Sequence, residues 1–107
     1  MAFEREDREE KALLRIQGDL TIFEIARLQA AMLETLDEQG GLVLDLKEVE
    51  ACDAAGVQLL CAAQKTALGE ALLFQVSEVS NAVLEALDRS GVEPRDALGA
   101  DWEPCED

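Results

Sequence analysis

Histidine and tyrosine are both absent from this sequence of 107 residues. Histidine is the commonest general base in enzymes and tyrosine a frequent acid, so Ser-His-Asp and Cys-His nucleophilic sites cannot be assembled within the chain. The paired glycines at 40–41 lead into an apolar run, and no GxxxxGK[ST] phosphate-binding loop occurs. We therefore expect a protein that is not an enzyme and needs no cofactor.

Basic residues are few, with 9 Lys and Arg against 24 Asp and Glu, and the net charge is −15. This charge repels phosphate backbones and anionic lipid headgroups, which disfavours nucleic-acid and membrane-surface partners. No apolar run approaches the ~18–20 residues of a membrane span, and residues 1–7 are acidic where a signal peptide is basic. We expect a cytoplasmic protein with a protein partner and no membrane insertion.

Metal-binding patterns are also missing. The three cysteines, Cys52, Cys61 and Cys105, show no pairing pattern, and mixed Cys/His zinc sites need histidine. We interpret Cys52 and Cys61 as reduced core residues. Four acidic residues lie close together in the sequence: Asp45, Glu48, Glu50 and Asp53. Their spacing matches no calcium loop, so a helix cap and a solvated connector explain them better than a metal site.

Apolar runs and helical periodicities alternate along the chain. Strands are expected at 12–17, 42–46 and 72–76, and residues 3–10 are interpreted as part of an opening strand or hairpin. Helices are expected from Thr21 to Gly40, from Asp53 to Gly69, and from Ser80 to Gly91. Residues 47–52 are expected to form a polar connector. This alternation predicts an α/β fold in which helices cover a sheet.

Two of the expected helices have specific start signals. Residues 21–24 match a capping box between Thr21 and Glu24, and Asp53 is expected to cap the second helix through the amide of Ala55 or Gly56. Each helix also has an expected buried face. The first face consists of Ile25, Leu28, Met32 and Leu36, and the second of Val57, Leu60, Cys61, Gln64 and Leu68.

The C-terminal residues 92–107 lack periodicity and contain Pro94, Gly99 and Pro104. We interpret residues 1–91 as the domain and 92–107 as an acidic extension without a core of its own. The extension is either a solvated tail or a patch for a basic partner. Trp102 either folds back onto the domain or anchors a partner.

The strand 42–46, which reads LVLDL, followed by residues 52–60 (CDAAGVQLL), resembles the signature of STAS domains, the family of the anti-sigma-factor antagonists. In that signature, such a strand leads to D-[S/T]-[S/A]-G-hydrophobic. Residues 18–21, 71–74 and 80–84 are also similar to the family's pattern, so the resemblance covers roughly residues 10–91. It implies a mixed sheet of about four to five strands flanked by helices, and a protein that binds a partner.

The resemblance also implies a docking surface at Asp53, Ala54, Ala55, Gly56 and Val57. In the antagonist branch, a kinase-type anti-sigma factor phosphorylates the Ser or Thr directly after the Asp. Ala54 occupies that position here, so the acceptor is lost and no modification is expected there. The small residues are also compatible with tight packing against the protein's own sheet. Helical spacing nevertheless places Ala54 outward when Val57 points inward.

Without that acceptor, the chain either stays permanently competent to bind or is regulated at another hydroxyl. The other hydroxyl-bearing residues are Thr21, Thr35, Thr66, Ser77, Ser80 and Ser90. Capping preference alone explains Ser80. The leading functional expectation is a bacterial signalling adaptor that binds an anti-sigma kinase or a chemotaxis or related regulator. The alternative is the STAS subunit that docks on the ATPase of an ABC-type lipid transporter.

Overall fold

The chain opens with a β-hairpin in the computed structural model, which describes residues 2–9 and 11–104. Strand β1 (Ala2–Asp7) pairs antiparallel with β2 (Ala12–Leu20), which confirms the predicted opening hairpin. β2 continues beyond Gly18, where the sequence indicated a stop. Gly18 has a φ of 91°, and the pairing register with the next strand shifts between Gly18 and Asp19. The glycine therefore bends the strand without ending it.

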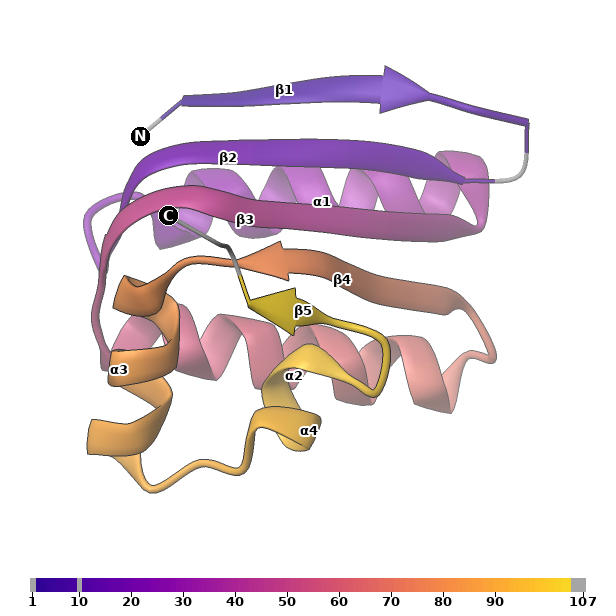
Figure 1. The fold of residues 1–107 in the computed structure, drawn as a ribbon. Helices are drawn as coiled ribbons and strands as arrows, with labels where there is room; N and C mark the ends of the chain where they lie inside the picture. The colour runs from indigo at the N-terminus through magenta and orange to yellow at the C-terminus, as the bar shows by residue number, and fades with distance from the viewer. Residues whose placement is uncertain (1, 10, 105–107) are drawn as a thin grey trace.

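The described residues form one five-stranded sheet in the order β1-β2-β3-β4-β5. β3 (Gly41–Cys52), β4 (Leu73–Val79) and β5 (Glu103–Pro104) are parallel to β2, and β1 alone is antiparallel. The mixed sheet predicted from the resemblance is confirmed. Because β2, β3 and β4 are parallel, their carboxyl ends meet at one edge of the sheet, on the left of Figure 1.

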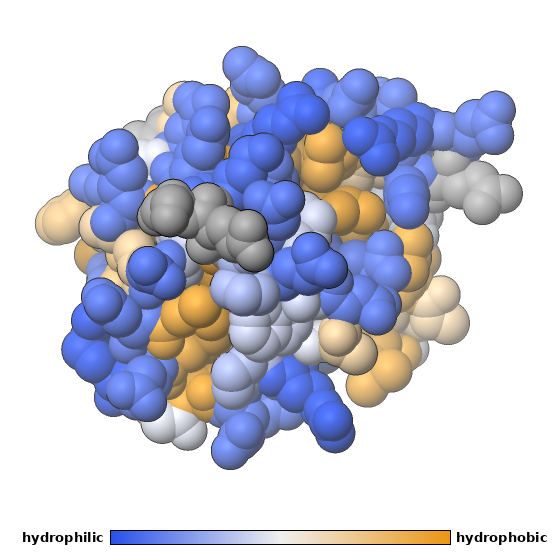
Figure 2. All heavy atoms as spheres, in the orientation of Figure 1, coloured by the Kyte–Doolittle hydropathy of each residue, from blue (hydrophilic) through white to orange (hydrophobic). Residues whose placement is uncertain are grey.

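Helices α1 (Ile25–Gln39) and α2 (Ala54–Gly69) run along one side of the sheet, and α3 (Asn81–Ser90) follows the end of β4 (Figure 1). The core lies between the helices and the sheet, and the face seen in Figure 2 is largely hydrophilic with smaller apolar areas between the polar residues. The strands contribute Leu14, Ile16, Leu42, Leu44 and Leu46, all at most 1% exposed. The predicted face of α1 is confirmed, since Leu28, Met32 and Leu36 are buried and Ile25 is partly buried against them.

The expected polar connector at 47–52 is wrong, because these residues complete β3. Their side chains alternate, with Glu48 and Glu50 exposed while Val49 is buried, as in a strand with one covered face. Pairing with β2 continues to the very end, where Cys52 lies opposite Leu20. Only Asp53 therefore separates the end of β3 from the first residue of α2.

The expected capping box at residues 21–24 is also wrong. α1 begins at Ile25, and no side chain caps it. Residues 21–24 instead form a turn in which the Glu24 amide donates to the Thr21 carbonyl at 2.9 Å. The residue at the N-cap of α1 is Glu24, so Thr21 lies three residues too early to take the N-cap position that a capping box requires.

The buried face of α2 differs from the expected one. Val57 and Leu60 are buried as predicted, but Leu68 is 84% exposed, and Cys61 and Gln64 are only partly buried. Leu59, Ala63 and Ala67 complete the buried face instead. Small residues on this face let the helix lie close to its neighbours.

Residues 92–104 contain a short helix, α4 (Pro94–Leu98), and the edge strand β5. Ala97 and Leu98 are fully buried in the core of the domain, and Trp102 packs partly buried against it. Of the two interpretations of Trp102, folding back onto the domain is confirmed. The division of the chain at residue 91 stays a prediction, and the tail end with Cys105 lies outside the described residues.

Candidate functional site

The start of α2 is fixed by the side chain of Asp53. Its backbone is extended, and its Oδ1 accepts a hydrogen bond from the Gly56 amide at 3.1 Å. The Val57 amide donates to the Asp53 carbonyl at 3.2 Å, which begins the helix. The predicted N-cap is confirmed, with Gly56 as the donor.

The second carboxylate oxygen of Asp53 holds a different segment. Oδ2 accepts from the Ile22 amide at 3.0 Å, and the Asp53 amide donates to the Leu20 carbonyl at 3.3 Å. Asp53 thereby ties the β2–α1 loop to the start of α2. Sequence reasoning missed this contact because 31 residues separate the partners. Only the parallel pairing of β2 with β3 indicates that the two segments are neighbours.

The five predicted site residues are brought together but fall into two groups. Gly56 and Val57 are buried, while Ala54 is exposed and Asp53 and Ala55 are partly exposed. A Cβ atom at position 56 would lie 2.8 Å from the Leu20 carbonyl oxygen and 2.9 Å from the Cys52 Sγ. Gly56 and Val57 therefore pack against the protein's own sheet. The outward position of Ala54, expected from helical spacing, is confirmed.

Cys52 lies directly beneath this helix start and is buried. Burial, followed by the negative charge of Asp53, raises the pKa of its thiol to about 11. Arg89, in the last turn of α3, donates from Nη2 to the Cys52 carbonyl at 3.3 Å. The site thus joins β2, β3 and the starts of α1 and α2 to the end of α3.

Two large apolar side chains are exposed to solvent in the loop next to this helix start. Ile22 is 66% exposed and Phe23 is 93% exposed. Both lie inside the predicted capping box at residues 21–24, and the sequence pattern indicated no role for either of them. The predicted helix start at Thr21 placed Ile22 and Phe23 in a first helical turn. A loop at these positions, with both side chains exposed, was therefore not expected.

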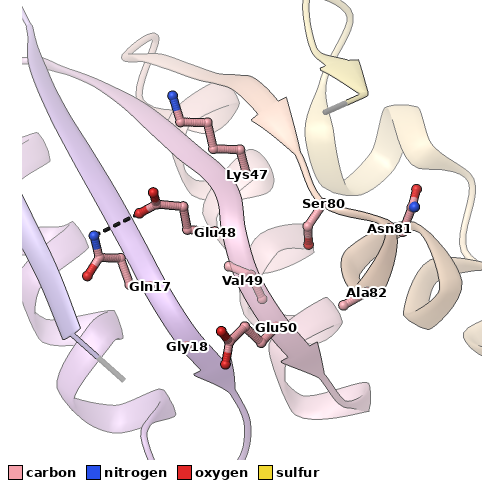
Figure 3. Close-up of a pocket in the computed structure, with 9 residues that line it drawn as sticks. All are labelled: Gln17, Gly18, Lys47, Glu48, Val49, Glu50, Ser80, Asn81 and Ala82. Atoms are coloured by element: carbon pink, nitrogen blue, oxygen red, sulfur yellow. Dashed lines mark hydrogen bonds between the residues drawn. The ribbon is translucent and has the colours of Figure 1, made fainter. Parts of the chain in front are cut away.

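A shallow polar hollow of about 590 Å³ lies nearby, over β2, β3 and the start of α3 (Figure 3). On one side of it, Gln17 Nε2 donates to Glu48 Oε2 at 2.7 Å. On the other side lies Ser80, which precedes α3 as expected for an N-cap. Its buried hydroxyl, however, makes no hydrogen bond to the described residues, so it does not cap the helix.

The four acidic residues considered together in the sequence have separate surroundings. Asp45 is buried on β3, with Lys47 and Arg15 at 3.7 and 3.9 Å. Glu48 binds Gln17, and Asp53 caps α2. These contacts account for three of the four as structural groups.

The helices within residues 2–9 and 11–104 are all too short or too polar for a membrane span. A mixed sheet covered by helices, with a capped helix start at its carboxyl edge, defines a small α/β domain. The family model described as "Mlab, STAS domain" matches residues 3–98, and the chain belongs to the STAS family.

Solved structures share this fold. The anti-sigma factor antagonist SpoIIAA in its unphosphorylated form has a TM-score of 0.73 at 17% identity, over 99% of this chain and 90% of that one. RsbS of Moorella thermoacetica, carrying a serine-to-glutamate substitution, has a TM-score of 0.75 at 18% identity, over 99% and 89%. An anti-sigma factor antagonist from Mycobacterium paratuberculosis has 0.71 at 23% identity, over 84% and 77%. No curated protein sequence matches this chain.

Proposed function

We propose that this chain is a non-catalytic protein-interaction module of the anti-sigma-factor-antagonist kind, which docks on its partner through the start of α2, where residues 53–55 face the partner and the buried Gly56 and Val57 support them. The partner is an anti-sigma kinase or a related bacterial regulator, and the chain acts in the cytoplasm. The observation that carries the proposal is the exposed Ala54 on a helix start that Asp53, Gly56 and Val57 fix from beneath.

The start of α2 supports docking because its exposed side chains are small and hydrogen bonds hold its backbone in place. Ala54 and Ala55 present only methyl groups, so a partner backbone or helix can approach closely. The two hydrogen bonds of the Asp53 carboxylate hold both edges of this surface in place before binding. A surface that is already ordered loses less conformational entropy when it binds.

The chemistry near the site supports a non-catalytic role. The thiol of Cys52 is the nearest nucleophilic group, and with its pKa raised to about 11 it stays protonated at neutral pH. With no histidine in the chain, there is no imidazole to activate the thiol.

Regulation by phosphate at this position is ruled out by chemistry, because alanine has no hydroxyl. A phosphate on the first turn of a helix adds nearly two negative charges to a contact surface. An Ala54→Glu variant imitates part of that charge. We therefore expect it to lose the partner while the helix, which favours acidic residues in its first turn, remains folded.

The experiment is affinity capture from the native host with the wild-type chain, followed by measurement of the identified partner's binding to purified variants. Ala54→Glu is expected to weaken binding at least tenfold. Ala30→Glu makes the same charge change at an exposed position within α1 and serves as the control. Equal binding by wild type and a folded Ala54→Glu variant would place the interface elsewhere. Recovery of an ABC-type transport ATPase would favour the alternative, transporter-associated function.

A further inference from the structure

Phe23 differs from the other phenylalanines of the chain in its surroundings. Phe74 is 8% exposed and Phe3 packs partly buried against the core, whereas Phe23 is 93% exposed. Ile22 beside it is 66% exposed. Large apolar side chains are usually buried, and adjacent exposed ones mark interaction sites when they form a patch.

The loop that carries these two side chains is held at both ends. The Ile22 amide is bound to Asp53 Oδ2 at 3.0 Å, and the Glu24 amide closes a turn onto the Thr21 carbonyl at 2.9 Å. The Leu28 amide then donates to the Glu24 carbonyl and starts α1. Phe23 therefore projects from a fixed turn and not from a loose segment.

The same aspartate positions the loop and the docking helix. Its Oδ2 binds the residue before Phe23, and its Oδ1 binds Gly56, two residues beyond Ala54. Phe23 and Ala54 thus each directly follow one of the two residues that the Ile22–Asp53 hydrogen bond joins, and they lie on adjacent segments of the surface. Asp53 is the positioning residue of this surface.

The charges around the loop indicate what kind of pocket receives it. Asp19 and Glu50 are exposed at the same edge of the sheet, since Asp19 pairs with Ala51 in the strand register. Arg89 also lies at this edge, through its hydrogen bond to the Cys52 carbonyl, but Asp19, Glu50 and Asp53 outnumber it, in line with the net charge of −15, so the apolar projection has a predominantly acidic setting. The complementary surface is an apolar pocket with Lys or Arg side chains on its rim.

We propose that Ile22 and Phe23 form a hydrophobic anchor that enters an apolar pocket with a basic rim on the partner protein, next to the Ala54 contact. This inference rests on the proposed function and adds the residues that supply most of the apolar contact. Aromatic anchors in desolvated pockets commonly dominate the affinity of an interface. Two copies of so acidic a chain repel each other, as do the chain and an anionic bilayer, which disfavours both as occupants.

Photo-crosslinking in the native host, with the full chain, tests the anchor. The photoreactive residue p-benzoylphenylalanine replaces Phe23 in one variant, Ala54 in a second, and Leu68 in a third. Leu68 is 84% exposed on the last turns of α2 and serves as the control. We expect positions 23 and 54 to label the same protein, and position 68 not to label it. The peptide labelled from position 23 is expected to be apolar and flanked by Lys or Arg.

The outcomes separate the anchor from the docking surface. Labelling from 54 without labelling from 23 overturns the anchor and leaves the proposed function intact. Labelling from neither position overturns both. A cross-link between position 23 and a second copy of the chain also overturns the anchor. So does binding to phosphatidylcholine–phosphatidylglycerol vesicles in a flotation assay, if that binding is lost when Phe23 is replaced.

Affinity gives a second readout. The partner that cross-linking identifies is purified, and its affinity for variants of the chain is measured. Phe23→Ser is expected to weaken this binding at least tenfold, whereas Leu68→Ser is expected to change it less than twofold. Both side chains are exposed, so neither substitution removes core packing. Equal effects of the two variants contradict a specific anchor.

Discussion

Gly56 is the residue whose size most tightly constrains the site. Its missing side chain lets α2 lie against the Leu20 carbonyl and the Cys52 sulfur. A methyl group there would force backbone or sulfur to move, because 2.8 and 2.9 Å are shorter than van der Waals contact allows. The motif glycine thus allows close packing beneath the proposed docking surface.

Gly56→Ala is therefore expected to destabilise the protein by about 1–3 kcal/mol, the usual cost of overpacking. Gly69→Ala is the matched control, because nothing lies within 4 Å of a Cβ at the last residue of the same helix. The control is expected to be neutral or slightly stabilising, since alanine favours helix over glycine. Urea denaturation of both variants provides the comparison, and equal effects would contradict the close packing at position 56.

Cys52 makes the free energy of unfolding depend on pH in the alkaline range. Its thiol has a pKa of about 11 in the folded protein, against an ordinary value of 9.0. Between these values the unfolded chain loses the proton while the folded protein keeps it, so stability falls as the pH rises from about 9 to about 11. Burial raises the pKa of Cys61 in the same direction.

We expect Cys52→Ala to reduce this loss of stability, as measured by denaturation at pH 8, 9, 10 and 11. Cys61→Ala is expected to reduce it less, because Cys61 is less buried. Full retention of the wild-type pH dependence in the Cys52→Ala variant would disprove the assignment to this thiol.

At the scale of elements, the starts of α2 and α3 look alike in the sequence but differ in the structure. Asp53 and Ser80 both precede a helix with extended backbone. The Asp53 carboxylate makes two hydrogen bonds, whereas the Ser80 hydroxyl makes none within the described part of the chain. Capping preference correctly predicts that both residues precede a helix. It correctly predicts a capping hydrogen bond for Asp53 but not for Ser80.

Asp53→Ala is expected to cost about 1–2 kcal/mol, because it removes a cap and leaves the Ile22 amide without its acceptor. Ser80→Ala is expected to change stability by less than about 0.5 kcal/mol, since no hydrogen bond is lost. Thermal denaturation ranks the two variants. A Ser80→Ala cost as large as that of Asp53→Ala would show that the Ser80 hydroxyl has a partner.

The element boundaries show what local pattern can and cannot predict. Periodicity predicted the buried face of α1 and the buried strand residues at 42–46, because in both segments the apolar side chains that form the pattern are also the ones that enter the core. It failed at 47–52, where charged side chains on the uncovered face of a strand resemble a connector. It failed again at 21–24, where a contact with Asp53 outweighs a local cap. Motif spacing predicted the helix start of the site, but the adjoining loop depends on a long-range contact.

For the whole molecule, the C-terminal residues belong to the packed structure. Leu98 and Ala97 are fully buried, and β5 pairs with β4 through Glu78 and Glu103. Removing residues 92–104 exposes the surface that they cover. The loss of Leu98 alone corresponds to about 1.5–3 kcal/mol of buried side chain.

We expect a chain truncated after Gly91 to have a lower Tm than the full chain by at least several degrees, as measured by circular dichroism. A chain truncated after Pro104 is the control, because it keeps α4 and β5. An unchanged Tm in the shorter chain would support an independent domain at 1–91.

The hydrogen bond between Ile22 and Asp53 spans 31 residues, and the one between Arg89 and Cys52 spans 37. The first requires that β3 has docked beside β2, and the second requires that α3 has closed over the end of β3. The opening hairpin and α1 are local structures, which form early, whereas contacts between distant segments form late. A chain in which β2, β3 and α3 have not come together therefore lacks the proposed docking surface, and binding of a partner at that surface is expected only after these elements have assembled.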